Sequence, residues 1–306
     1  MQAEFSRPGR IRVPVGVPTS ASYACHRPDH RAERGRRRPC APSCGFSKAI
    51  HSEPGVIRLT TSDVRDINEL RSVLDRDGYI VIENVGSTEN AEKLLSGLGS
   101  ILPQYDGRKS HEIVVTPGFE DLLHSKTSRE IYVHTEAPGW DPVPQYLALY
   151  CHAQARCGGG HTTICDGRKF LADLSDRERE LMYDVETDFP GAYGTQGKDG
   201  EAEWTVHKPM VSRDVDGTEV IRFSYTHLTF GDYTPDLGRD VFVDRLPLGE
   251  EGIALAEHGT RFFNDNHLPV LVPDHALLIW DNRRMFHGRS SYTDQRRHLT
   301  RFFVGA

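Results

Sequence analysis

Residues 276–287 read Ala-Leu-Leu-Ile-Trp-Asp-Asn-Arg-Arg-Met-Phe-His, and this stretch does most to decide the fold. The apolar run 276–280 is typical of a buried strand, and Asp281-Asn282-Arg283 indicates a turn. Met285-Phe286-His287 begins a further strand, and residues 298–304 give the pattern of another. Antiparallel strands joined in this way would carry His287 on one strand and Arg297 or Arg301 on the next.

The triplet His134-Thr135-Glu136 stands 151 residues before His287. With 15 histidines and 44 acidic residues, about two His-x-Asp/Glu triplets are expected by chance. The other is His51-Ser52-Glu53, in a stretch rich in Pro, Arg and Cys. His134 instead follows Ile131-Tyr132-Val133, which predicts a strand, so His134 and Glu136 would share one face. Two imidazoles and one carboxylate can occupy one face of an octahedral Fe(II).

Short strand patterns separated by Gly, Pro and Asp turns dominate the rest of the chain and favour a mainly β fold with flanking helices, an antiparallel sandwich or barrel. Strands are expected at residues 79–83, 112–115, 131–135, 145–152, 162–165, 204–208 and 220–226, besides those already described. Helices are expected at residues 61–76, 90–98, 175–183 and 250–264. The triple glycine Gly158-Gly159-Gly160 is interpreted as a hairpin turn.

A family resemblance rests on these residues together. Pro273, Ala276, Ile279-Trp280-Asp281-Asn282-Arg283 and His287, followed by Arg297 and Arg301, resemble the C-terminal signature of the taurine dioxygenase and clavaminate synthase-like superfamily. Residues 146–151 and 158–163 resemble the part of that family in which a Gly-rich turn precedes a co-substrate-binding threonine. The resemblance spans roughly residues 56–306 and implies a double-stranded β-helix, which is a distorted jelly roll.

The resemblance implies an Fe(II)- and 2-oxoglutarate-dependent dioxygenase that uses O2 and releases succinate and CO2. His134, Glu136 and His287 would be the metal ligands, with no further catalytic residue expected. Arg301 would take the distal carboxylate of 2-oxoglutarate, and Arg297 would lie nearer its chelating end. Thr162 would hydrogen-bond the same co-substrate, with Thr163 as the alternative because a one-residue shift reverses the face of a strand. Glu136 argues against the halogenating relatives, which carry a small residue there.

Composition bounds the remaining possibilities. The chain has 306 residues, 37% hydrophobic content and no apolar run near the roughly 18 residues that cross a bilayer. Residues 1–54 hold ten Lys and Arg against four acids, a charge of +6, so residues 55–306 carry −13 of the overall −7. We expect the arm 1–54 to be disordered or the product of a mis-assigned start, with residues 55–306 forming the oxygenase domain. No secretory signal is recognisable, so a cytoplasmic location is expected, without membrane or nucleic-acid partners.

The substrate and oligomeric state are not predicted. The acidic body weakly suggests an amine-bearing or amino-acid-like small molecule, and the resemblance suggests specialised metabolism, including antibiotic biosynthesis. Hydroxylation is the expected outcome, with desaturation or cyclisation on the same scaffold as alternatives. A non-catalytic jelly-roll binding protein is the rival from another functional class, and iron-dependent succinate formation separates the two.

Overall fold

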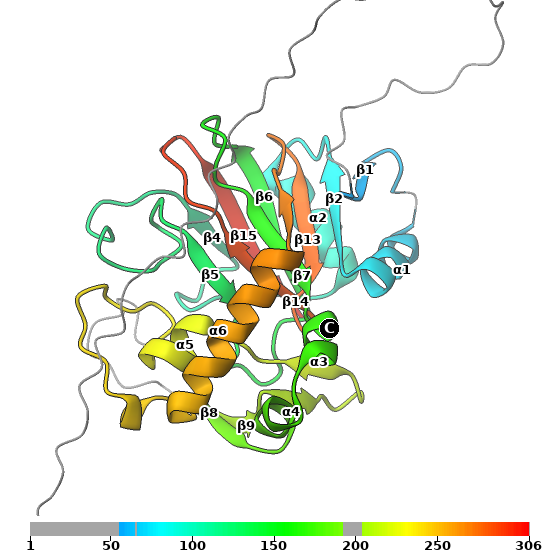
Figure 1. Ribbon diagram of the computed structural model, residues 1–306. Coiled ribbons are helices and arrows are strands. Elements are labelled where there is room, and N and C mark those ends of the chain that lie inside the picture. Colours follow the sequence, from blue (N-terminus) through cyan, green and yellow to red (C-terminus); the bar gives the residue numbers. More distant parts are fainter. Residues whose placement is uncertain (1–54, 65, 192–203, 306) are drawn as a thin grey trace, which may run out of the picture.

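The computed structural model describes residues 55–64, 66–191 and 204–305, and Figure 1 shows their arrangement. The predicted arm 1–54 and the triplet His51-Ser52-Glu53 lie outside the described residues. Two β-sheets face each other, with helices on their outer surfaces. The predicted mainly β architecture with flanking helices, the double-stranded β-helix, is therefore confirmed.

The major sheet contains seven strands, in the order β1-β2-β13-β6-β15-β3 with β4 also paired to β15. All pairings are antiparallel except β1 with β2. Its strands are β1 (Arg58–Thr60), β2 (Tyr79–Glu83), β3 (Ile101–Leu102), β4 (Ser110–Ile113), β6 (Tyr146–Ala153), β13 (Leu277–Asp281) and β15 (His298–Val304).

The minor sheet is antiparallel and has the order β12-β7-β14-β5. Its strands are β5 (Ile131–His134), β7 (Thr162–Asp166), β12 (Leu268–Val270) and β14 (Met285–Arg289). Two separate pairs join β8 (Glu186–Pro190) to β9 (Thr205–Pro209) and β10 (Val211–Arg213) to β11 (Glu219–Ile221).

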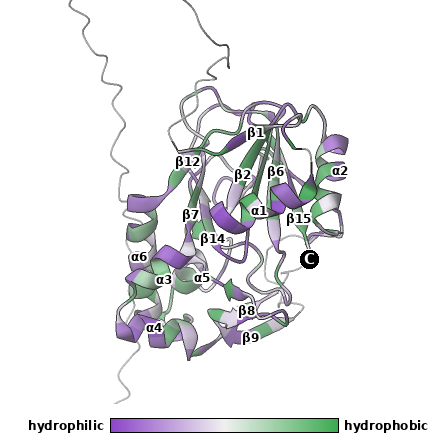
Figure 2. Ribbon diagram, turned by 90° about the vertical axis from the view of Figure 1, so that its right-hand side faces the viewer, coloured by the Kyte–Doolittle hydropathy of each residue, from purple (hydrophilic) through white to green (hydrophobic). Residues whose placement is uncertain are grey.

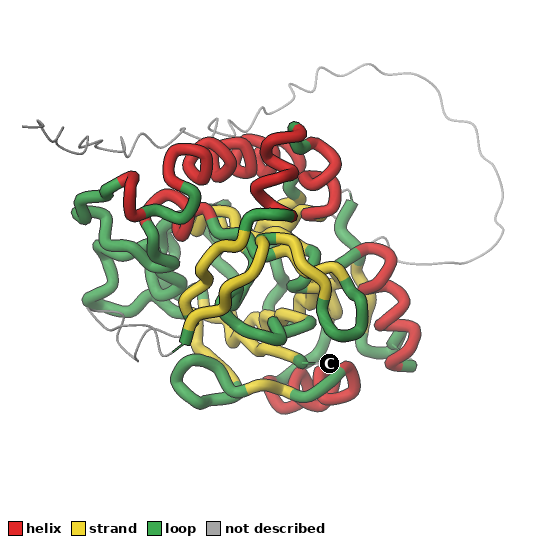
Figure 3. Tube along the Cα trace, turned by 90° about the horizontal axis from the view of Figure 1, so that it is seen from below, coloured by secondary structure: helices red, strands yellow, loops and turns green. Residues whose placement is uncertain are grey.

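The helices flank the strands, as Figure 3 shows from below. They are α1 (Ile67–Asp77), α2 (Thr88–Leu98), α3 (Gly167–Asp173), α4 (Asp176–Tyr183), α5 (Tyr225–Phe230) and α6 (Gly249–Asn266), with a 3-10 turn at Val243–Arg245. In Figure 2, α6 carries both hydrophilic and hydrophobic segments, as expected for a helix with one buried side. None of the described helices is both long and apolar enough to cross a membrane.

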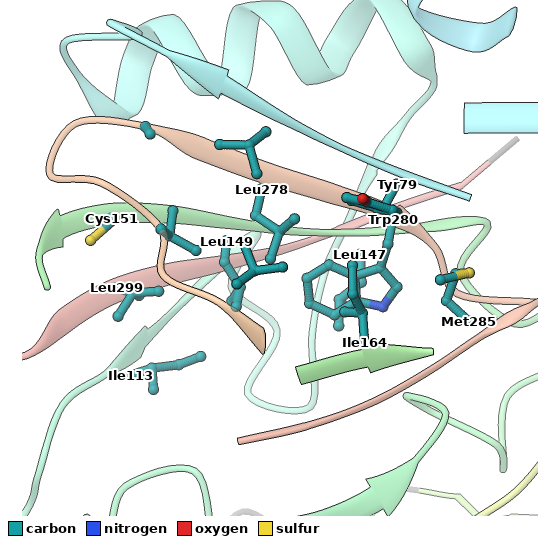
Figure 4. Packing of buried hydrophobic residues seen from close by; sticks show 14 of the residues in the cluster. Tyr79, Ile113, Leu147, Leu149, Cys151, Ile164, Leu278, Trp280, Met285 and Leu299 are labelled. Atoms are coloured by element: carbon teal, nitrogen blue, oxygen red, sulfur yellow. The ribbon is translucent and has the colours of Figure 1, made fainter. Parts of the chain in front are cut away.

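Three layers of buried apolar residues hold these elements together. One lies between the two sheets, where Leu147 of β6, Trp280 of β13 and Ile164 of β7 come together (Figure 4). A second lies between the major sheet and α1 and α2. A third packs α6 against the outer face of the minor sheet through residues such as Phe263 and Phe286. Burial of both faces of β13 explains the uninterrupted apolar run that the sequence shows.

Several element boundaries differ from the predictions. The first helix begins at Ile67 rather than near residue 61, because Asp66 caps it by accepting a hydrogen bond from the Asn68 amide. Gly78 ends that helix in a left-handed conformation, which glycine adopts without strain. The strand expected at 220–226 stops at Ile221, because Ser224 caps helix α5. The other expected strands and helices are present, with ends that agree with the expectation or differ from it by one or two residues.

Two predicted connections are wrong. The glycine turn at 158–160 links β6 to β7, which belong to opposite sheets, so it is a crossover between layers and not a hairpin turn. The strands that carry His287 and Arg301, β14 and β15, are likewise not neighbours but belong to facing sheets. Side chains from both can therefore meet in the space between the sheets.

Candidate metal centre

His134 and His287 occupy directly opposed positions on β5 and β14. Their ring centroids are 4.0 Å apart. Glu136 lies two residues past His134, just beyond the end of β5. The Nε2 atoms of both histidines are 3.8 Å from Oε2 of Glu136. The three side chains named from the sequence thus come together, with donor atoms all within 4.8 Å of one another.

Glu136 is not held by strand alternation, as the sequence suggested, but by Asn282. The Asn282 Oδ1 accepts a hydrogen bond of 2.8 Å from the Glu136 amide, and Nδ2 donates one of 2.9 Å to the Glu136 carbonyl. Nδ2 also donates to the Pro144 carbonyl at 3.2 Å, and Asn282 is 1% exposed. The sequence pattern indicates only a turn at Asn282. The sequence feature that could have indicated its role in holding Glu136 is its position directly after the buried strand β13.

The protonation of the cluster suits a divalent metal. The His134 Nδ1 lies 2.8 Å from the Tyr132 carbonyl, which can only accept, so Nδ1 carries a proton and Nε2 is the nitrogen left to ligate a metal. Burial and the neighbouring His134 lower the pKa of His287 to about 4, so its imidazole is neutral at pH 7. Burial alone would raise the pKa of Glu136, but Arg301 and the two histidines hold it well below 4.5. Two imidazoles and one carboxylate form a transition-metal donor set.

Arg301 lies at the metal-ligand cluster. Its Nη1 is 3.0 Å from Oε1 of Glu136, and its Nε donates to Oε1 of Gln104 at 2.9 Å. Gln104 in turn donates through Nε2 to the Arg301 carbonyl. Arg301, not Arg297, is therefore the arginine beside Glu136, which reverses the order predicted for the two. No sequence pattern marks Gln104, because it belongs to a loop distant in the chain.

Arg297 lies just before β15, four residues from Arg301, and also lines the cavity. It is 2% exposed, its Nε donates to the Gly160 carbonyl at 3.1 Å, and its buried Nη1 has no hydrogen-bond partner among the residues that the structure describes. Burial lowers the pKa of Arg297, which marks a guanidinium that lacks a compensating carboxylate. Such a group is suited to a small anion that enters the cavity.

Thr162 and Thr163 fall on opposite faces of β7. Thr162 is paired with Arg289 across the strands and lines the cavity, whereas Thr163 is opposite Gly288 and does not. The geometry thus favours Thr162 over its alternative. Arg289, two residues after His287, also lines the cavity, and its guanidinium donates to the carbonyls of residues 125, 127 and 129. Strand alternation from His287 could have identified it.

All six predicted site residues border one cavity of about 590 Å³ between the sheets. A second hollow of about 620 Å³, around Cys157, contains none of them. The first cavity is also lined by Tyr105, Phe119, Trp140 and Lys126. Metal-binding, anion-binding and apolar groups therefore share a single space.

Known proteins resemble this chain. A 3-((Z)-2-isocyanoethenyl)-1H-indole synthase from Fischerella ambigua (strain UTEX 1903) is 23% identical over 201 residues, which cover 60% of this chain and 68% of that protein. Asparagine oxygenase, solved with Fe(II), 2S,3S-3-hydroxyasparagine and succinate, gives a TM-score of 0.59 at 21% identity over 78% of each chain. The non-haem iron oxygenase OrfP, solved with Fe and alpha-ketoglutaric acid, gives 0.55 at 17% identity, covering 78% of this chain and 79% of that one.

These structural likenesses support the fold, and the family model goes further. It is described as taurine catabolism dioxygenase TauD, TfdA family, and it matches residues 37–303. The match contains every residue of the cavity discussed above and all of both sheets except the last residue of β15. The resemblance inferred from the sequence is therefore confirmed, and the chain belongs to the TauD/TfdA dioxygenase family.

Proposed function

We propose that this protein is an Fe(II)- and 2-oxoglutarate-dependent oxygenase in which His134, Glu136 and His287 hold the metal. The observation that carries the proposal is the convergence of these three side chains in a cavity that is also lined by three buried arginines, Arg297 and Arg301 among them. Three ligands from one side leave other coordination positions open to co-substrates. Zinc hydrolysis would not require the second buried guanidinium.

Arg297 and Thr162 are proposed to hold the distal carboxylate of 2-oxoglutarate. Support comes from the unpartnered, buried Nη1 of Arg297 and from the cavity-facing position of Thr162. A guanidinium binds a carboxylate through charge-assisted hydrogen bonds. Arg301 is proposed to act at the other end, where it holds Glu136 in its charged form and orients it.

When bound, the iron with 2-oxoglutarate and O2 supplies the oxidising power, and succinate and CO2 are the co-products. The chain's own residues bind, orient and exclude water. Asn282 fixes the backbone of Glu136, and the Tyr132 carbonyl fixes the tautomer of His134. Leu147, Leu149 and Trp280 provide an apolar wall to the cavity, which limits access of water to the reacting groups.

The lining of the cavity supports a substrate with an apolar or aromatic part and an anionic group. Four cationic side chains and two carboxylates border the cavity. The charges of Fe(II) and of 2-oxoglutarate would cancel each other, so the cavity would keep a positive charge available to a substrate anion. Lys126 is half-buried, lies 4.9 Å from the Phe119 ring centroid, and forms no ion pair within the described part of the chain. It is the proposed contact for a substrate carboxylate. The overall charge suggested an amine-bearing or amino-acid-like substrate. The cationic side chains of the cavity favour the second of these, a substrate that carries a carboxylate, such as an amino acid or a related acid.

Hydroxylation is the first candidate outcome, as in the asparagine oxygenase, whose complex contains a hydroxylated amino acid. Desaturation is the second, because the indole relative is named for an ethenyl product. The expectations of a cytoplasmic location and of no nucleic-acid partner belong to the same proposal.

The test is anaerobic loading with Fe(II), followed by O2, 2-oxoglutarate and a panel of amino acids and their N-modified derivatives. Succinate released above the substrate-free background, with a product 16 mass units heavier or about 2 lighter, supports the proposal and separates hydroxylation from desaturation. His287→Ala should abolish both signals. Substrate-dependent succinate that is unchanged in His287→Ala would contradict the assignment of the metal site.

A further inference from the structure

A second group of metal-binding side chains lies on the other face of the major sheet. Glu112 of β4, His152 of β6 and His298 of β15 place their donor atoms within 4.8 Å of one another. β15 is hydrogen-bonded to both β4 and β6, so three adjacent strands each contribute one side chain. None of these residues borders the cavity between the sheets.

Strand alternation explains why the two groups are separate. On β15, Arg301 faces the cavity, whereas Phe302 packs in the layer beneath α1 and α2. Thr300 shares the face of Phe302 and contacts both Glu112 and His152. The second group thus occupies the outer face, and Glu112 and His298 have side chains 52% and 39% exposed. A cation from solvent can reach it.

Local structure brings the donors together. Between the pairs His298↔Ala153 and Leu299↔Cys151 the register skips His152, a β-bulge that changes the direction of a side chain. The His152 and His298 rings are stacked, with centroids 4.2 Å apart. The Thr300 hydroxyl accepts from Nε2 of His152 at 2.7 Å and donates to Oε1 of Glu112 at 2.9 Å. Nε2 of His298 contacts Oε2 of Glu112 directly.

We propose that Glu112, His152 and His298 form a second site, for a divalent transition metal such as Zn²⁺ or Co²⁺. Two imidazoles and a carboxylate suit these ions, whereas Ca²⁺ and Mg²⁺ prefer oxygen ligands throughout. The metal would take the place of the contact between His298 and Glu112 and of the hydrogen bond from His152 to Thr300. This site is independent of the iron assignment, because the two sets of ligands have no residue in common.

Occupancy of this site would connect the edge strand to the centre of the sheet. β4 is four residues long and pairs with β15. A metal shared by β4, β15 and β6 would cross-link all three. Because His111, next to Glu112, borders the cavity opposite Arg301, the cross-link would also restrain that wall of the cavity.

The test is Co²⁺ titration of the reduced full-length protein, followed by calorimetry and by visible absorption. His152→Ala and His298→Ala should each bind one equivalent fewer than the wild type. Both variants should keep the Co²⁺ ion bound at His134, Glu136 and His287, whose visible absorption responds to 2-oxoglutarate. That retained response serves as the control for correct folding. His134→Ala should show the converse loss.

His207→Ala is the matched control. Its imidazole contacts two carboxylates, Glu186 at 2.9 Å and Asp188 at 2.7 Å, but within the described ranges it belongs to no group of three metal-binding side chains. The His207→Ala variant should therefore bind Co²⁺ as the wild type does. If an alanine variant does not fold, the mostly exposed Glu112→Gln decides the matter, since it should weaken the same equivalent at least about tenfold. An unchanged stoichiometry and affinity in all three variants would overturn the proposal.

Discussion

Replacement of Asn282 by alanine would show whether the turn after β13 positions the metal-binding carboxylate. Its side chain makes three hydrogen bonds, two to the backbone of Glu136 and one to Pro144. All three partners are backbone groups, and Asn282 is 1% exposed. The variant therefore leaves polar groups unsatisfied while it removes no metal ligand.

The expected cost follows from those contacts. A net hydrogen bond contributes about 0.5–1.5 kcal/mol, and a buried group left unsatisfied costs about 1–3 kcal/mol. Because water in the adjacent cavity can satisfy part of the loss, we expect Asn282→Ala to lower the free energy of unfolding by about 2–4 kcal/mol. Fe(II) affinity should fall by about 10- to 100-fold, as is typical when a residue that orients a metal ligand is lost.

Urea unfolding of the metal-free protein and Fe(II) titration under anaerobic conditions measure the two effects. Asn266→Ala is the control, since Asn266 is exposed and donates a single hydrogen bond to the Phe262 carbonyl. It should change stability by less than about 0.5 kcal/mol and leave iron binding unaltered. If Asn282→Ala binds Fe(II) as tightly as the wild type, Glu136 does not depend on this anchor and the reasoning is refuted.

Three further predictions concern charge. Arg297→Ala should raise the KM for 2-oxoglutarate about 10- to 150-fold in steady-state assays, with Arg297→Lys recovering part of the loss; an unchanged KM would remove Arg297 from the co-substrate site. Arg301→Ala should destabilise the metal-free protein by about 3–5 kcal/mol, because it leaves the buried carboxylate of Glu136 without its partner, and added Fe(II) should restore part of this in thermal unfolding. Burial, with Arg301 and Lys126 nearby, lowers the pKa of His124 to about 4, so as the pH drops the unfolded chain binds a proton at His124 before the folded chain does. The free energy of unfolding should therefore fall as the pH drops from about 6.5 to 4. In urea unfolding at a series of pH values, His124→Gln should reduce that decline by on the order of 1–3 kcal/mol.

The sequence was sufficient for the family, the fold class and the convergence of His134, Glu136 and His287. Each depended on a strong local pattern: a buried apolar strand, a β-branched run before a histidine, and an ordered set of polar residues. The strand at 79–83 was predicted to the residue, because an apolar run is bounded there by Gly78 and by polar residues.

The remaining features depend on long-range geometry that local patterns do not encode. Which sheet a strand joins cannot be determined from its own residues, so Gly158–Gly160 was misread as a hairpin. The position of Arg301 beside Glu136 differs from the expectation for a similar reason, since both arginines line the cavity and only the position of Glu136 decides which is nearer to it. Glu112, His152 and His298 lie on three strands, and no spacing in the chain brings them together.

The central claim is that His134, Glu136 and His287 hold Fe(II) with open positions for 2-oxoglutarate. Anaerobic titration of 2-oxoglutarate into the Fe(II)-loaded protein tests it most directly, because a 2-oxo acid chelated to Fe(II) gives a visible charge-transfer absorption. We predict a band that saturates at one equivalent in the wild type and is absent from folded His134→Ala and His287→Ala. A band that persists in either variant, or none in the loaded wild type, would contradict the account.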